Sequence, residues 1–233
     1  VVILNCEEII IMKLINKIKR KLTKLRFHPI RVFCLHHVCE TFDVESMYEC
    51  DWMQIDEFKN KVSSMQKGGV EFISLTEAYK HICNDWFRRK KYAVLTFDDG
   101  WSTIKSIIPW LCEEHIPFAL FVNPSYLIGE EKREKGISIT LREMEKLLEL
   151  GGEYVQIASH SWNHRLCAEM KMSEFEENVN RCESFFYQYN KSYIPFFAYP
   201  CGQNTSRQNK YLLSKHIIPV LMDGAKNYND TLA

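Results

Sequence analysis

Residues 92–100 have the sequence Tyr92-Ala93-Val94-Leu95-Thr96-Phe97-Asp98-Asp99-Gly100. The first six residues have the apolar and aromatic character of a strand buried on both faces, and two carboxylates and a glycine follow directly. Adjacent acids at the end of a buried strand are costly, because two negative charges so close repel each other unless a cation lies between them. A metal site or a proton-transfer role would account for the pair. The alternative is an Asp-Gly turn in which one aspartate caps a helix that begins near Ser102.

Apolar runs of strand length alternate along the chain with segments whose apolar residues recur at helical spacing. The expected strands are 32–36, 70–74, 92–97, 117–122, 154–159, 194–199 and 217–222, with a helix in every gap. Two of the helical stripes stop at glycine pairs, Gly68-Gly69 and Gly151-Gly152. Parallel βα units of this kind form either a barrel or an open sheet, and both gather functional residues at the carboxyl ends of the strands.

Helix starts are predicted by three matches to the capping box, in which two side chains satisfy backbone amides of the first turn. The matches are Ser74 with Glu77, Thr140 with Glu143, and Ser173 with Glu176. The longest irregular stretch, 123–139, is charged and contains two glycines, so it is predicted to be a surface loop.

Composition narrows the class of protein. The 233 residues are 46% hydrophobic and 26% charged, which fits one globular domain. Thirty basic residues against thirty acidic ones leave no net charge, so nucleic acid is excluded as an expected partner. Nine cysteines, an odd number without CxxC pairs, are typical of reduced thiols, and we therefore expect a cytoplasmic protein.

The amino-terminal part, residues 1–30, is distinct from the rest of the chain. Residues 13–26 contain seven basic side chains and no acid, and Met12 before them is a candidate start. The pattern predicts a basic amphipathic helix that makes peripheral contact with the inner face of a membrane. The alternative is a solvated charged face preceding the domain.

A second polar cluster follows the strand expected at 154–159. It has the sequence His160-Ser161-Trp162-Asn163-His164, and histidines four apart would share one face of a helical turn, as two imidazole ligands need. Such pairs are also common on helix surfaces. With an aspartate from residues 98–99 as third ligand, they would form an open zinc site. Zinc in such a site lowers the pKa of water from about 15.7 to about 7.

A third segment, Ala198-Tyr199-Pro200-Cys201-Gly202, ends an apolar strand in a turn, and simple turn chemistry is the alternative interpretation. Thr96–Gly100, His160–His164 and Ala198–Gly202, in this order, resemble the first three motifs of the polysaccharide deacetylases, the NodB-homology domain of carbohydrate esterase family four. The resemblance implies a distorted (β/α) barrel of about seven parallel strands, formed by residues 31–233. It also implies a metal-dependent enzyme that removes N-acetyl or O-acetyl groups from a polysaccharide, an oligosaccharide or a lipid-linked glycan.

The resemblance assigns roles by motif position. Asp98 is the expected general base, which takes a proton from the attacking water. The backbone amide of Cys201 is expected to stabilise the oxyanion, and Ser161 to brace the histidines. The divalent metal, zinc with cobalt or nickel as alternatives, is expected on three ligands: Asp99, His160 and His164.

Two departures from the family pattern matter. Ala198 stands where many members have an arginine that orients the base, and Cys201 replaces an aromatic residue. The late Leu-x-His motif, whose histidine protonates the leaving amine, has no counterpart before Ala233, which predicts a domain shortened at its carboxyl end. His36 and His37 after the first strand are candidate substitutes for this acid, and the alternative for each is an ordinary packed or surface histidine.

Three functions remain open at this point. The first is a deacetylase acting on an acetylated glycan. The second is a non-catalytic carbohydrate-binding or assembly protein on the same barrel, which the missing acid and the altered third motif suggest. The third is a metal-dependent amidohydrolase of a non-sugar amide. The oligomeric state is not indicated by the sequence.

Overall fold

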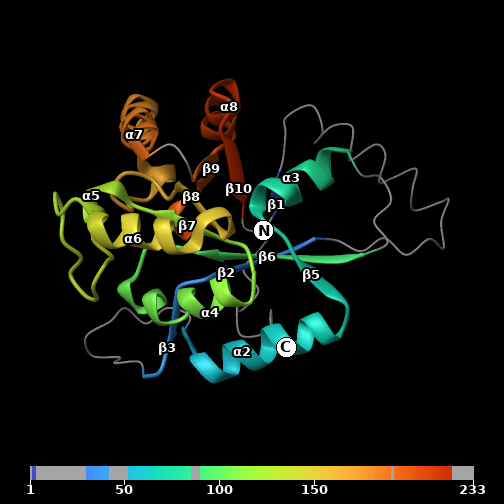
Figure 1. The fold of residues 1–233 in the computed structure, drawn as a ribbon. Helices are drawn as coiled ribbons and strands as arrows, with labels where there is room; N and C mark the ends of the chain where they lie inside the picture. Colours follow the sequence, from blue (N-terminus) through green and yellow to red (C-terminus); the bar gives the residue numbers. More distant parts are fainter. Residues whose placement is uncertain (1, 4–29, 42–51, 85–89, 190–191, 222–233) are drawn as a thin grey trace.

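A curved sheet of parallel strands forms the centre of the computed structural model (Figure 1). The structure describes residues 2–3, 30–41, 52–84, 90–189 and 192–221. Every predicted strand is present within two residues of its expected bounds: β2 (Arg31–Leu35), β5 (Val70–Phe72), β6 (Lys91–Phe97), β7 (Phe118–Val122), β8 (Val155–Ser159), β9 (Tyr193–Ala198) and β10 (Ile218–Leu221). The prediction of an α/β fold with about seven parallel strands is confirmed.

The strands lie side by side in the order β10, β9, β8, β7, β6, β2, and β5 pairs with the first residues of β6. The short strand β1 (Val2–Ile3) adds to β10 in the antiparallel sense. A separate parallel pair consists of β3 (His37–Cys39) and β4 (Trp52–Gln54). Within the described residues the main sheet runs from β1 to β2 without joining these two edges, so it is a barrel open along one side.

Each gap between consecutive strands of the parallel sheet contains a helix, as predicted. The α-helices are α2 (Ile55–Lys67), α3 (Leu75–Asn84), α4 (Ile108–Glu113), α5 (Pro124–Leu127), α6 (Leu141–Gly151), α7 (Met172–Phe186) and α8 (Ser206–Ser214). Short 3-10 turns are η1 (Ser102–Ser106), η2 (Gly152–Tyr154), η3 (Cys167–Glu169), η4 (Tyr187–Tyr189) and η5 (Pro200–Gly202).

Both glycine pairs end helices as predicted. Helix α2 ends at Lys67, directly before Gly68, and α6 ends at Gly151. Gly151 also permits close packing on the sheet, because a Cβ atom at this position would lie 1.8 Å from Cγ2 of Val155 in β8. A side chain there would therefore push α6 away from the strand that leads to the predicted histidine pair.

Two of the three predicted capping boxes are confirmed. The Ser74 hydroxyl accepts a hydrogen bond from the amide of Glu77, and the Glu77 carboxylate accepts one from the amide of Ser74. Thr140 and Glu143 make the same reciprocal pair at the start of α6.

The third capping box, Ser173 with Glu176, is wrong. Helix α7 already begins at Met172, so Ser173 lies inside the first turn. The carboxylate of Glu174 accepts a hydrogen bond of 3.1 Å from the amide of Lys171, the residue before the helix. Glu174 thus makes the backbone bond that the prediction gave to Glu176, and the helix begins two residues earlier than predicted.

Alternate residues of the central strands enter different apolar layers. Leu95 of β6 packs in the layer formed with α2, α4 and α6, whereas its neighbour Val94 packs with Phe121 of β7 and Leu75 of α3. Because both faces of this parallel sheet are buried, polar side chains are accommodated mainly at the strand ends. The carboxyl ends of β2, β6, β8 and β9 are therefore the places to look for a site.

Two sequence predictions concern features beyond this sheet. The basic segment 13–26, expected to be a membrane-contacting helix, lies outside the described residues. Among the helices in the described ranges, none is both long and apolar enough to cross a membrane. The cysteines in those ranges form no disulfides.

Candidate metal centre and active site

The two aspartates lie in a sharp turn at the end of β6. The amide of Asp98 continues the pairing with β2 by donating a hydrogen bond of 2.9 Å to the carbonyl of Leu35. Asp99 and Gly100 then adopt left-handed conformations, with φ of 71° and 66°. Both carboxylates are more than 90% buried. The alternative in which an aspartate caps the next helix does not hold, because η1 follows Trp101 without a side-chain cap.

The histidine pair lies in a loop after β8, and the predicted helical turn is wrong. Ser161 and His164 have left-handed backbones, with φ of 67° and 59°, which a helix does not allow. The Ser161 hydroxyl accepts a hydrogen bond of 3.1 Å from the amide of His164. Asn123, after β7, donates through its side chain to the carbonyls of His160 and Ser161. These bonds fold the loop so that both imidazoles face the same point.

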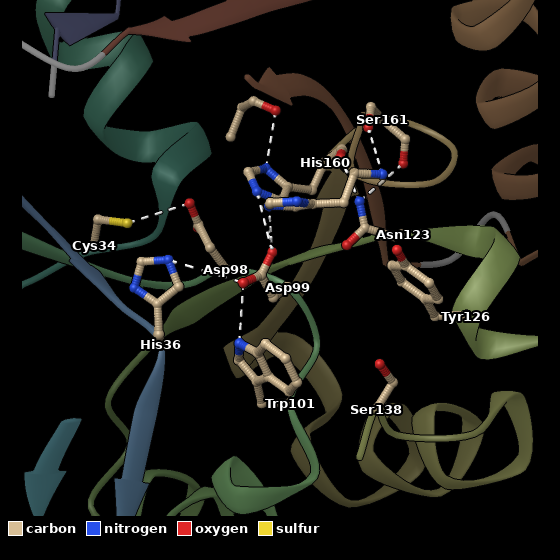
Figure 2. A network of polar contacts seen from close by, with 12 residues as sticks. Cys34, His36, Asp98, Asp99, Trp101, Asn123, Tyr126, Ser138, His160 and Ser161 are labelled. Carbon is tan, nitrogen blue, oxygen red and sulfur yellow. Dashed lines mark hydrogen bonds and ion pairs between the residues drawn. The ribbon is translucent and has the colours of Figure 1, made fainter. Parts of the chain in front are cut away.

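The loop brings both imidazoles to Asp99, although they belong to a different strand end. Figure 2 shows His160 beside Asp99. The Nε2 atom of His164 lies 3.0 Å from Oδ1 of Asp99, and that of His160 lies 3.4 Å from the same oxygen. In a tetrahedral zinc site with bonds of about 2.0–2.1 Å, neighbouring ligand atoms lie about 3.3 Å apart. The two distances to Asp99 are thus close to this spacing, and all three ligand atoms lie within 4.8 Å of one another.

The hydrogen bond to the far side of the His160 ring selects the tautomer. Nδ1 of His160 lies 3.0 Å from the carbonyl oxygen of Ala198 at the end of β9. A carbonyl only accepts, so Nδ1 carries a proton and donates it. Nε2 is then the atom that donates to Asp99 in the protonated ring and that offers its lone pair to a metal in the neutral ring. A neutral imidazole in this state is suited to bind a metal.

The electrostatics of the cluster favour a cation. Burial opposes ionisation of Asp99, but hydrogen bonds from His160 and His164 hold the pKa of its carboxyl well below the usual range. Burial alone would lower the pKa of His160, whereas its hydrogen bond with Asp99 and the charges of Asp98 and Asp99 raise it. Without a metal, a protonated His160 supplies positive charge beside the carboxylates.

Comparison with known proteins places this site in a family. The sequence model described as polysaccharide deacetylase matches residues 87–217, more than half of the chain. The chain belongs to the polysaccharide deacetylase family. The match covers β6 through α8 and so includes all three motifs. A sequence search of curated proteins gave no significant match.

Several solved structures have a similar fold. The deacetylase PplD of Streptococcus pyogenes has 19% identity and a TM-score of 0.66, with 81% of this chain and 80% of PplD covered. IcaB of Ammonifex degensii has 20% identity and a TM-score of 0.67, with 83% and 82% covered. A de-N-acetylase of Aggregatibacter actinomycetemcomitans has 19% identity and a TM-score of 0.60, with 80% and 84% covered. These likenesses show that the fold is that of a polysaccharide deacetylase barrel.

This deacetylase uses an arginine that the sequence analysis did not identify. Arg133 lies in the stretch 123–139, which was predicted to be a surface loop, yet its side chain is only 5% exposed. Its guanidinium donates to the carbonyl of Asp99 at 2.7 Å and to Asn123 Oδ1 at 3.1 Å. The surface-loop prediction is wrong here, because the charged side chain stacks between the rings of Trp101 and Tyr126.

Trp101 is a second residue that sequence reasoning missed. Its indole Nε1 donates a hydrogen bond of 3.0 Å to Oδ2 of Asp99, the oxygen that does not face the histidines. Gly136 leaves room for this ring, because a Cβ atom there would lie 2.5 Å from it. The glycine was the one sequence signal that this loop approaches another group closely.

The two candidate acids of the first strand occupy different environments. His36 faces the site, with Nε2 4.0 Å from Oδ2 of Asp99 and its side chain 20% exposed. His37 is 1% exposed, and its Nδ1 lies 2.9 Å from Oγ1 of Thr103. Burial lowers the pKa of His37 to about 4, so it is neutral at neutral pH and has no proton to give. Geometry therefore favours His36 as the residue that meets a substrate.

The remaining predicted residues lie at the same end of the barrel. Oδ2 of Asp98 accepts a hydrogen bond from the thiol of Cys34 at 3.2 Å, and its other oxygen is buried. Cys201 follows β9 in a left-handed conformation, with φ of 53°. Partial removal from water and the negative charge of Asp99 raise the pKa of the Cys201 thiol, so this residue lies within the field of the site.

Proposed function

We propose that this chain hydrolyses N-acetyl or O-acetyl groups from a polysaccharide, oligosaccharide or lipid-linked glycan. The observation that carries the proposal is the convergence of both histidine Nε2 atoms on one oxygen of Asp99 from two strand ends. Membership of the polysaccharide deacetylase family supports it. The fold neighbour named a de-N-acetylase points in the same direction.

The donor set fits a divalent metal. Two imidazoles and one carboxylate, of which His164 is 26% exposed, suit zinc, with cobalt and nickel as alternatives. Zinc in such a site makes hydroxide available at neutral pH and polarises a carbonyl oxygen. Asp99, His160 and His164 would hold the ion, and Trp101 and Arg133 fix the side chain and backbone of Asp99 so that little rearrangement is needed on binding.

Asp98 is the residue suited to accept a proton. It is next to Asp99, buried, and anchored through Oδ2 by the thiol of Cys34. Its Oδ1 atom has no hydrogen-bond partner among the described residues, so a lone pair remains for the attacking water. Asp98 removes one proton from that water as the carbon–oxygen bond forms.

The other side of the reaction needs a donor for the oxyanion and a proton for the leaving group. The backbone amide of Cys201, in the turn after β9, would stabilise the oxyanion of the tetrahedral intermediate. His36 would give a proton to the amine nitrogen as the carbon–nitrogen bond breaks, since it faces Asp99 and has access to solvent. Water is thereby consumed, and acetate and the free amine are released.

The test is acetate release from an acetylated glucosamine oligomer with added zinc or cobalt. We expect release by the native chain and a loss of at least a hundredfold in Asp98→Asn, because general base catalysis contributes about 10²–10⁴-fold. Asp56→Asn, the same chemical change on the exposed surface of α2, is the control and should keep full activity. Glycan binding without acetate release would instead support the binding-protein alternative, and equal release by Asp98→Asn would refute the assignment of the base.

A further inference from the structure

A second group of metal-binding side chains lies beside the first. It consists of Cys34 at the end of β2, His36 directly after it, and Asp98 at the end of β6. Their ligand atoms, a sulfur, an imidazole nitrogen and a carboxylate oxygen, lie within 4.8 Å of one another. The pairing of β2 with β6, which sets Cys34 opposite Thr96, brings the three together (Figure 2).

Two atoms of this group have no hydrogen-bond partner within the described part of the chain, and a bound cation would be a partner for both. Oδ1 of Asp98 and Nδ1 of His36 are both buried and have no hydrogen-bond partner among the described residues. Asp98 is only 7% exposed, so this carboxylate is largely removed from bulk solvent. Buried polar atoms without partners are uncommon and costly, and a carboxylate oxygen in this state is a ready ligand.

The geometry is close to that of a bound ion. Sγ of Cys34 and Oδ2 of Asp98 are 3.2 Å apart. Ligand atoms of a tetrahedral zinc with a thiolate bond of about 2.3 Å and an oxygen bond of about 2.0 Å lie about 3.5 Å apart. The thiol hydrogen now lies between sulfur and oxygen, and a cation bound to both atoms would replace it.

We propose that Cys34, His36 and Asp98 form a second metal site that takes a thiophilic divalent cation, zinc or cadmium. On binding, the thiol proton passes to solvent and the sulfur–metal bond forms. A thiolate ligand selects such ions over manganese, which prefers oxygen ligands. The first site, formed by Asp99, His160 and His164, contains no sulfur ligand, so this selectivity belongs to the second site alone.

Filling this site has a consequence that rests on the proposed function. The cation would occupy the carboxylate of Asp98 and the imidazole of His36, the proposed base and acid. Zinc would then activate the enzyme at low concentration, through the first site, and inhibit it at higher concentration, through the second. Manganese in excess would not inhibit.

The experiment measures bound metal on the full chain. After equilibration with excess zinc and removal of free metal, we expect two ions per native chain and one in Cys34→Ser, which keeps a hydrogen-bond donor for Asp98. With cadmium, the native chain should show ultraviolet sulfur-to-cadmium absorption that Cys34→Ser lacks. Cys34→Ala is the second variant, and Cys201→Ser, which removes an exposed thiol of the same region, is the matched control and should keep both signals.

The outcomes separate the two proposals. A native chain that binds one ion, or a second ion retained in both Cys34 variants, refutes the second site. Loss of the second ion in Cys201→Ser also refutes it. Two ions and the cadmium signal in a chain that releases no acetate support the site and refute only the proposed function. In an active chain, we expect excess zinc to reduce acetate release at least fivefold, with Cys34→Ser resistant, and equal inhibition of both would refute the inhibitory role.

Discussion

Replacing Arg133 by methionine tests how the backbone of Asp99 is held. Methionine keeps the apolar stem but removes a guanidinium that donates to the Asp99 carbonyl at 2.7 Å, to Ser138 Oγ at 2.8 Å and to Asn123 Oδ1 at 3.1 Å. The side chain is 5% exposed, so water cannot replace the guanidinium without opening the loop. The acceptors would be left buried and without their donor.

The expected loss follows from these contacts. A hydrogen bond with a charged partner contributes about 1.5–3 kcal/mol. Contributions from one side chain are not additive, and removing one member of a buried charged group costs about 3–5 kcal/mol. We therefore expect Arg133→Met to lower the free energy of unfolding by about 3–5 kcal/mol. Arg133→Lys keeps the charge but not the planar fork, so its loss should be about 2 kcal/mol.

The measurement is urea unfolding at neutral pH with a metal chelator, so that differences in bound metal do not contribute. Arg142→Met, an identical substitution at an exposed position of α6, is the control and should change the free energy of unfolding by no more than about 0.5 kcal/mol. A loss of unfolding free energy below about 1 kcal/mol for Arg133→Met, or an equal loss for Arg133→Met and Arg142→Met, would show that Arg133 does not hold the site.

Three further predictions use other parts of the structure. The pKa of His37 is lowered by burial from 6.5 to about 4, so the unfolded chain binds a proton that the folded chain rejects, and stability falls from pH 6.5 toward pH 4. This loss of stability amounts to about 3 kcal/mol between pH 7 and pH 4. Urea unfolding at the two pH values should show it in the native chain but not in His37→Gln, and the same pH dependence in both chains would contradict this. Gly151→Ala should lower the free energy of unfolding by about 1–3 kcal/mol, because the added Cβ overlaps with β8. Gly68→Ala, whose added Cβ has no contact below 3.3 Å, should lower it less, and equal melting temperatures of the two variants would contradict this. In a chain that carries Cys34→Ser and so lacks the second site, free zinc at a thousandfold excess over its dissociation constant should raise the free energy of unfolding by about 4 kcal/mol. The increase should disappear in Asp99→Asn and remain in Asp56→Asn, and its persistence in Asp99→Asn would remove that residue from the ligands.

Local patterns were sufficient to predict the framework of the fold. The strand that ends at Phe97 and the helix that ends before Gly68 are set by apolar periodicity and by residues within one turn of each boundary. The metal-ligand candidates could be named because the topology rule places the ends of parallel strands together. Asp99 and the histidine pair therefore meet, as expected, even though 61 residues separate Asp99 from His160.

What the sequence did not indicate depends on contacts between distant residues. Arg133 is held largely by groups outside its own loop, the carbonyl of Asp99, 34 residues before it, and the ring of Trp101. The one local signal is Gly136, which leaves room for the Trp101 ring. The turn between His160 and His164 was expected to be helical from spacing alone. Its actual form depends on Asn123, a residue of another strand end, which binds the carbonyls that a helix would have used.

The backbone of the site is itself informative. Six non-glycine residues in the described ranges have left-handed conformations, and four of them are at the candidate site: Asp99, Ser161, His164 and Cys201. Each such conformation costs about 1 kcal/mol or more for a residue with a side chain, so the surroundings must impose it. Asn123 holds the carbonyls before and at Ser161, and Arg133 holds the carbonyl of Asp99. The same bonds that stabilise the fold thus orient the ligands, which is why the unfolding energy of Arg133→Met reports on the geometry of the site as well as on burial.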